Sequence, residues 1–176
     1  MITNSTTDEK EDIFNKNFSI EELKEAVKGL QSKKSPGTDK IMSEFMKHLG
    51  GKALNAILSL FNFIWKMGVP DSWRKAIIIP ILKPNKDPAE VDSYRPIALT
   101  SILAKTMEKM IHARLNWFLE KQLLITPVQA GFRKFRSTTQ QVAKLSQEIK
   151  DALHNSKSTL AVFIDFKSAY DSIWRQ

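Results

Sequence analysis

Cysteine is absent from this sequence of 176 residues, which excludes disulfide bonds and metal sites built on thiolates. Long apolar runs are absent as well, since no stretch reaches the roughly eighteen apolar residues that a membrane-spanning helix needs. The N-terminal residues are acidic and polar and lack the apolar core of a secretory signal. We therefore expect an intracellular protein that is not secreted and has no membrane partner.

Glycine is scarce too, and none of the six glycines begins the phosphate-binding pattern G-x-x-x-x-G-K-[ST]. This absence excludes a P-loop ATPase.

Positive charge, in contrast, is in excess, with a formal net charge of +8. Residues 1–30 carry four lysines against seven acidic residues, so the rest of the chain has a net charge of +11. A basic body of this kind either meets a polyanion such as nucleic acid or is simply a solvated surface.

Two capping boxes and the spacing of apolar residues predict a mostly helical chain. Ser19 and Ser137 each precede a Glu or Gln by three residues, with apolar residues at helical spacing behind them. Residues 1–18 are polar and predict a mobile tail. Helices are expected over 19–30, 41–49, 52–67, 101–121 and 137–154, the last with a buried face of Val142, Leu145, Ile149 and Leu153.

Runs of β-branched residues predict the strands. AIIIPIL at 76–82 is of strand type, and Pro80 within it indicates an edge strand or a bulge. RPIALT at 95–100 is the expected return segment after an exposed loop. LAVFI, ending at Ile164, predicts a further strand over 159–165.

That further strand ends in a carboxylate, Asp165. A carboxylate at a strand end can bind a metal ion and the phosphates that the ion carries. It can equally cap a following helix or pair with a nearby lysine. An aspartyl-nucleophile phosphatase is excluded because Lys167 stands where that class has a second aspartate. The residues alone leave the metal-binding and structural alternatives open.

Four segments occur in the order KKSPGTDKI (33–41), WRKAIIIPILKPNKDPAEVDSYRPIALTSILAKTMEKMIHARL (73–115), QAGFRKFRSTTQQ (129–141) and FIDFKSAYDSIW (163–174). Together they resemble the motifs of reverse transcriptases from non-LTR (LINE-type) retrotransposons, closest to the jockey-like elements. Lys40 and Gln140 replace the glycine and aspartate that are usual there. The resemblance runs from about residue 19 to the end, and four motifs in register are far more specific than one.

The resemblance implies roles for the last segment. Asp165 would bind the two divalent ions, Mg²⁺ or Mn²⁺, that align a primer 3′-hydroxyl with the incoming dNTP, and the backbone carbonyl of Phe166 would be a further metal ligand. Tyr170 would pack beneath the sugar and exclude a 2′-hydroxyl. Asp171 would be structural, as a cap or an ion-pair partner.

The resemblance also implies roles for basic residues upstream. Arg95 and Lys83 would fold down onto the dNTP triphosphate from a fingers hairpin. Nucleic-acid contacts along the template or nucleotide path are implied for Gln129, Arg133, Lys134, Arg136, Lys33 and Lys34. The last two lysines are equally well explained as a solvated loop. Phe132 and Phe135 either stack on bases or belong to a core.

The expected fold class is α+β, with the fingers of a right-hand polymerase over 19–158 and the start of its palm over 159–176. The fingers would be mostly helical with a short β-hairpin. Residues 159–165 would form the first strand of an antiparallel palm sheet, and the domain would be incomplete.

The implied function is that of an RNA-directed DNA polymerase in the cytoplasm and nucleus, using an RNA template, a DNA primer and dNTPs. The family's second catalytic motif, aromatic-x-Asp-Asp, is absent, because the sequence has no adjacent pair of aspartates. We therefore expect the chain to be inactive alone. The alternative is a non-catalytic basic remnant that binds RNA or DNA.

Overall fold

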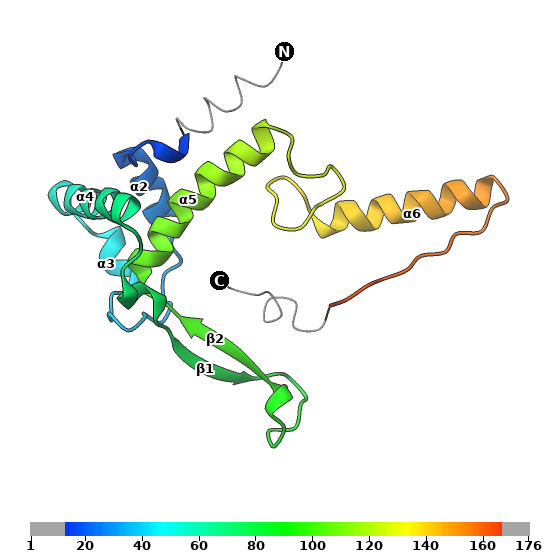
Figure 1. Cartoon of the computed structure of the whole chain (residues 1–176). Helices are drawn as coiled ribbons and strands as arrows, with labels where there is room; N and C mark the ends of the chain where they lie inside the picture. The colour runs from blue at the N-terminus through cyan, green and yellow to red at the C-terminus, as the bar shows by residue number, and fades with distance from the viewer. Residues whose placement is uncertain (1–12, 167–176) are drawn as a thin grey trace, which may run out of the picture. The chain divides into compact units, whose positions relative to one another are not determined.

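A computed structural model describes residues 13–166 of the chain (Figure 1). The chain divides into two compact units, Met1–Leu124 and Ile125–Gln176. The division falls inside the region expected to form the fingers. Within the described residues no helix is long and apolar enough to cross a membrane.

The first unit combines helices with one hairpin, as predicted. Its elements are α2 (Ile20–Lys28), α3 (Ser43–Lys47), α4 (Gly51–Met67), β1 (Ile77–Leu82), β2 (Tyr94–Leu99) and α5 (Ile102–Lys121), with short 3-10 turns at Asp71–Arg74 and Val91–Ser93. The second unit contains α6 (Thr138–His154). The mostly helical character and the antiparallel hairpin are therefore confirmed.

Both predicted capping boxes are formed. The Ser19 hydroxyl accepts from the backbone N–H of Glu22, whose carboxylate accepts from the Ser19 N–H in return. Ser137 and Gln140 repeat the arrangement at the start of α6. Each box gives partners to N–H groups that the first turn of a helix otherwise leaves unpaired, which is why both helices begin where they do.

The core of the first unit lies where α2 packs against α3, α4 and α5. Leu23 and Phe61 are completely buried, and Met110 of α5 is 1% exposed. Burying side chains of this size removes about 1.5–3 kcal/mol each of unfavourable hydration. The core thus ties together helices that lie far apart in the sequence, and it fixes the base from which the hairpin extends (Figure 1).

The polar tail predicted over residues 1–18 ends earlier than expected. Phe18 is 3% exposed and belongs to the core. Its backbone N–H donates to Asn62 Oδ1 at 2.6 Å, and its ring lies 5.1 Å from that of Trp65. Trp65 Nε1 in turn donates to the carbonyl of Phe14 at 3.0 Å. The polar composition concealed two phenylalanines whose burial outweighs the entropy of ordering residues 13–18.

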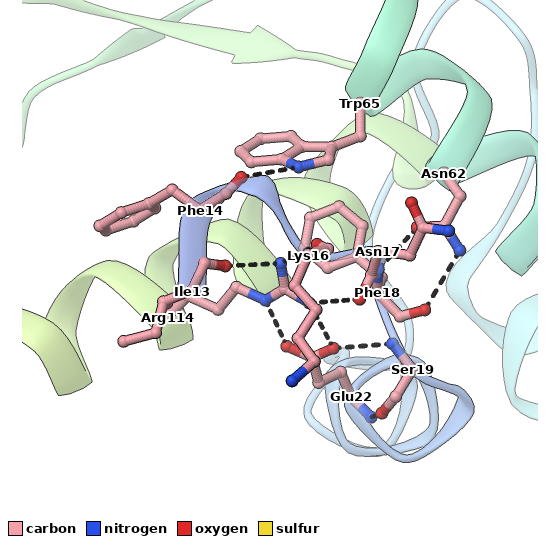
Figure 2. Close-up of polar contacts among 10 residues, drawn as sticks. All are labelled: Ile13, Phe14, Lys16, Asn17, Phe18, Ser19, Glu22, Asn62, Trp65 and Arg114. Carbon is pink, nitrogen blue, oxygen red and sulfur yellow. Dashed lines mark hydrogen bonds and ion pairs between the residues drawn. The ribbon is translucent and has the colours of Figure 1, made fainter. Parts of the chain in front are cut away.

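Arg114 of α5 also holds this N-terminal segment (Figure 2). The Nε and Nη2 atoms of Arg114 lie 2.6 and 2.8 Å from the two carboxylate oxygens of Glu22, a bidentate pair. The same guanidinium donates to the carbonyls of Ile13, Lys16 and Asn17. Burial by itself raises the pKa of Glu22, but hydrogen bonds from Arg114 and the Ser19 N–H, together with the arginine charge, hold that pKa below its usual value.

Gly37, in the loop before α3, is buried against the start of α5. A Cβ at this position would lie 2.5 Å from the carbonyl carbon of Thr100 and 2.6 Å from the nitrogen of Ser101. Both are backbone atoms, which cannot rotate away as a flexible side chain would. The Pro-Gly of the 33–41 motif therefore has a packing role, which anchors the basic loop beside the junction of β2 and α5.

We expect Gly37→Ala to lower the free energy of unfolding by about 1–3 kcal/mol, because the added methyl group overpacks this contact. Guanidinium denaturation followed by tryptophan fluorescence measures the change. Gly51→Ala is the matched control, since nothing lies within 4 Å of a Cβ added there and the position begins a helix. Equal stability of the two variants would contradict the packing role.

Two expectations for the second unit are not met. The face of α6 expected to be buried is exposed, with Val142 at 67% and Leu153 at 68%, and no residue of this helix is buried among those described. Residues 157–166 form neither helix nor strand, so the strand expected over 159–165 is not formed. A strand exists only through hydrogen bonds to a neighbour, and the one sheet among the described residues is β1–β2.

Candidate active site

The hairpin β1–β2 accommodates two prolines without losing a ladder hydrogen bond. The strands pair antiparallel with Pro80 opposite Pro96. The backbone N–H of Lys83 donates to the carbonyl of Ser93 at 2.8 Å. Because bonded and non-bonded pairs alternate along such a ladder, the prolines occupy a pair whose nitrogens point away from the partner strand. The edge position predicted from Pro80 is therefore confirmed.

The same register places both residues predicted to bind the triphosphate on one face of the hairpin. Arg95 lies opposite Ile81, and Lys83 follows Ile81 by two residues, so the two cations are diagonal neighbours. Lys83 Nζ donates to the carbonyl of Asp92 at 2.7 Å, which holds this side chain against the hairpin loop. Arg95 is exposed, and its guanidinium makes no hydrogen bond or ion pair to the other residues between 13 and 166.

The loop before α3 presents Lys33 and Lys34. The backbone of Lys33 is in the left-handed region, with φ of 57°, and its N–H donates to the Glu44 carboxylate. This bond, with a further one from the N–H of Glu44 itself, lowers the pKa of the Glu44 carboxyl. The backbone of Lys33 is thus fixed to the start of α3 while its side chain stays exposed.

Lys34 lines a hollow of about 720 Å³ between the hairpin and α5. Ile79, Ile81 and Ile97 of the hairpin contribute apolar surface to it. Lys34, Lys105 and Lys109 border the same hollow, together with the acidic Glu108 and with His112. The two lysines of α5 stand four residues apart, the spacing of one helix face, but nothing else in the sequence distinguishes them from other surface lysines. Lysines therefore line this hollow from both α5 and the loop before α3, on the side opposite the hairpin.

Four further predicted residues lie together in the second unit, on the loop over 126–136 that precedes α6: Gln129, Arg133, Lys134 and Arg136. Arg133 is half-buried, and its Nη1 donates to the carbonyls of Thr126 at 3.0 Å and Gln129 at 3.2 Å. The structure therefore uses Arg133 to brace the loop. Lys134 and Arg136 are exposed, as a contact to phosphate requires.

Asp165 lies near the end of segment 157–166, which is neither helix nor strand, and is exposed, as is Phe166. Within residues 13–166 no group of three or more histidine, aspartate or glutamate side chains could hold a metal ion. Tyr170 and Asp171 lie outside the described residues. Lys83 and Arg95 belong to the first unit and Asp165 to the second. That these three residues meet at one active site therefore stays a prediction.

Comparison with known proteins identifies the family to which these motifs belong. Residues 81–176 match the family described as reverse transcriptase (RNA-dependent DNA polymerase). The match includes β1 from Ile81 onward, all of β2, α5 and α6, and the segment that carries Asp165. It therefore covers both the hairpin cations and the predicted metal ligand.

Curated relatives agree with this match. The chain is 37% identical over 160 residues to the probable RNA-directed DNA polymerase from transposon BS of Drosophila melanogaster, covering 90% of this chain and 18% of the relative. It is 35% identical over 157 residues to the RNA-directed DNA polymerase from mobile element jockey of Drosophila funebris, covering 89% and 17%. The chain thus spans under a fifth of the length of these relatives. It belongs to the reverse transcriptase family and forms part of such a domain of the jockey- and BS-like, non-LTR retrotransposon type.

Proposed function

We propose that this chain supplies the nucleotide-binding hairpin and one metal-binding carboxylate of an RNA-directed DNA polymerase. The reaction is transfer of a nucleotide from a dNTP to the 3′-hydroxyl of a DNA primer on an RNA template. The observation that carries the proposal is the placement of Lys83 and Arg95 on one face of a hairpin within the family match. A guanidinium offers a planar fork to phosphate oxygens and an ammonium a compact charge, so the pair suits a triphosphate.

The proposed metal site uses Asp165 and the backbone carbonyl of Phe166. Both are oxygen donors, the kind that Mg²⁺ or Mn²⁺ prefers, and Mg²⁺ is commonly held by one or two carboxylates plus substrate phosphates. The donors thus fit in kind. A site for two ions needs negative charge beyond that of Asp165, and residues 13–166 show no group of three or more histidine, aspartate or glutamate side chains around it. A bound ion supplies charge stabilisation at the phosphoryl oxygens.

The remaining predicted residues surround the substrate in this proposal. Tyr170 acts as the sugar gate that rejects a 2′-hydroxyl. Template contacts come from Gln129, Lys134, Arg136, Lys33 and Lys34. Arg133 acts indirectly, since its bonds to two loop carbonyls set the shape of the segment that carries Lys134 and Arg136.

A second candidate function is a basic RNA- or DNA-binding module without turnover. The segment from 121 to 147 favours it, since this stretch holds five basic residues and no acidic one. Such a segment binds phosphates through contacts that weaken as salt rises. This candidate needs no second catalytic motif.

Primer extension tests the polymerase directly. The chain replaces its matching segment in the transposon BS polymerase, and the chimera is assayed on an RNA template with a DNA primer, dNTPs and Mg²⁺. We expect extension by the chimera and none by the 176-residue chain alone, because one carboxylate cannot neutralise two cations. Denaturing gel electrophoresis of the labelled primer provides the measurement.

The unaltered transposon BS polymerase is the positive control. If that enzyme extends the primer while a well-folded chimera does not, this chain fails as a polymerase part. Salt-dependent binding of nucleic acid by the chain, combined with that result, would establish the binding module instead.

A further inference from the structure

Two aromatic side chains of the loop over 126–136 point into solvent. Phe132 is 87% exposed and Phe135 is 95% exposed, so the structure places neither ring in a core. Both residues have left-handed backbone conformations, with φ of 61° and 59°. Residues with side chains seldom adopt this region, and bulky ones least of all. The loop therefore presents two large apolar rings to solvent, three residues apart and with the same backbone conformation.

The shape of this loop is braced from within. Arg133, which lies between the two rings in sequence, donates to the carbonyls of Thr126 and Gln129. The backbone N–H of Gln129 donates to the Thr126 carbonyl at 3.1 Å. At its other end the loop enters α6 through the Ser137 capping box. The rings are thus mounted on a segment with hydrogen bonds at both ends, which lowers the entropy lost when a ligand binds.

The surroundings of the rings are strongly basic. Lys134 and Arg136 alternate with the two phenylalanines and are exposed. No acidic residue occurs between Glu120 and Glu148. The loop and the first turn of α6 also border a hollow of about 510 Å³, lined by Phe132, Arg136 and Val142 among others. Exposed rings interleaved with cations are the composition that binds single-stranded nucleic acid, since bases stack on the rings and cations meet the phosphates.

We propose that Phe132 and Phe135 form a stacking platform for unpaired bases, with Lys134 and Arg136 holding the phosphates. The inference rests on the proposed function and deepens it, since it names an unpaired strand as the ligand of this loop. Duplex bases already stack on their neighbours, so their faces are covered and the rings gain little from them. The platform accordingly selects single-stranded RNA or DNA over a duplex of the same sequence. This selection does not require polymerase activity.

The test uses the full 176-residue chain and fluorescein-labelled RNA and DNA single strands, each compared with its duplex by fluorescence anisotropy over a salt series. We expect Phe132→Leu and Phe135→Leu each to weaken single-strand affinity by about 5- to 150-fold, the range of one lost base stack. Duplex affinity should stay within about twofold. Phe132→Tyr should bind like the parent, because the ring is kept.

Leu153→Ala is the matched control, since it removes an exposed apolar side chain from the far end of α6. It should leave every affinity unchanged. Leucine keeps an apolar side chain but has no ring on which a base can stack. Unchanged single-strand affinity in both leucine variants therefore overturns the platform. Equal affinity of the parent for single strand and duplex also overturns it. Loss of all salt-dependent binding by the parent overturns the proposed nucleic-acid function as well.

Discussion

Asp165→Asn is expected to abolish primer extension by the chimera, with a loss of at least about a thousandfold in rate. Metal-assisted stabilisation of phosphoryl oxygens contributes several kcal/mol, and each 1.4 kcal/mol is about tenfold in rate. Asparagine has nearly the same shape as aspartate but lacks its negative charge. The segment around Asp165 is exposed, so the substitution should leave the fold intact. Single-nucleotide incorporation measured in rapid-quench experiments gives the rate.

Asp151→Asn is the matched control, since Asp151 is another exposed aspartate of the second unit and lies on α6. Among residues 13–166 its side chain accepts a hydrogen bond from Gln147 of the same helix, so incorporation should be unchanged. A rate within a few-fold of the parent for Asp165→Asn would remove Asp165 from the metal site. Circular dichroism of both variants separates loss of catalysis from loss of fold.

Arg114→Ala is expected to lower the free energy of unfolding of the first unit by about 3–5 kcal/mol, the cost of breaking a largely buried ion pair. The Arg114 side chain is only 10% exposed. Its loss leaves the Glu22 carboxylate without its bidentate partner and removes the hydrogen bonds that Arg114 donates to the carbonyls of residues 13, 16 and 17. It also removes the guanidinium that lies 4.3 Å from the ring centroid of Phe18.

Guanidinium denaturation measures the loss, and tryptophan fluorescence is a suitable probe because Trp65 bonds to the same N-terminal segment. Arg114→Lys serves where the alanine variant is unfolded, since lysine keeps the charge and loses the planar fork. We expect the lysine variant to lie between the parent and Arg114→Ala. A lysine variant as stable as the parent would show that charge alone, without bidentate geometry, holds the segment.

The pH dependence of this difference has a definite sign. The pKa of Glu22 is lowered in the folded state, so its ion pair contributes stability above the usual glutamate pKa and loses it as the pH falls through the folded value. The stability difference between parent and Arg114→Ala should therefore be largest near neutral pH. It should shrink in acid, and a difference that grew in acid would contradict the ion pair.

Short-range patterns predicted much of this fold because their physics is local. A capping box needs only a serine and an acidic or amide residue three positions on, so Ser19 and Ser137 marked two helix starts correctly. Proline has no backbone N–H to donate to a neighbouring strand and is therefore rare in the interior strands of a sheet, so Pro80 correctly indicated an edge strand. Failures came where the outcome depends on a partner far along the chain. The apolar face of α6 and the run before Asp165 were expected to be buried, but no described residue covers them.

The family, the order of the motifs and the chemical kinds of the candidate site residues follow from the amino-acid sequence, since they depend only on which residues occur and how they are spaced. Which of these candidate site residues lie near one another depends on the tertiary structure. The fold places Lys83 and Arg95 on one face of the hairpin, with Lys105 and Lys109 across a hollow from it. It also places Arg133 where it braces its loop, and it exposes the rings of Phe132 and Phe135. The physical reason is that register, burial and long-range hydrogen bonds depend on contacts between distant segments, which no local pattern encodes.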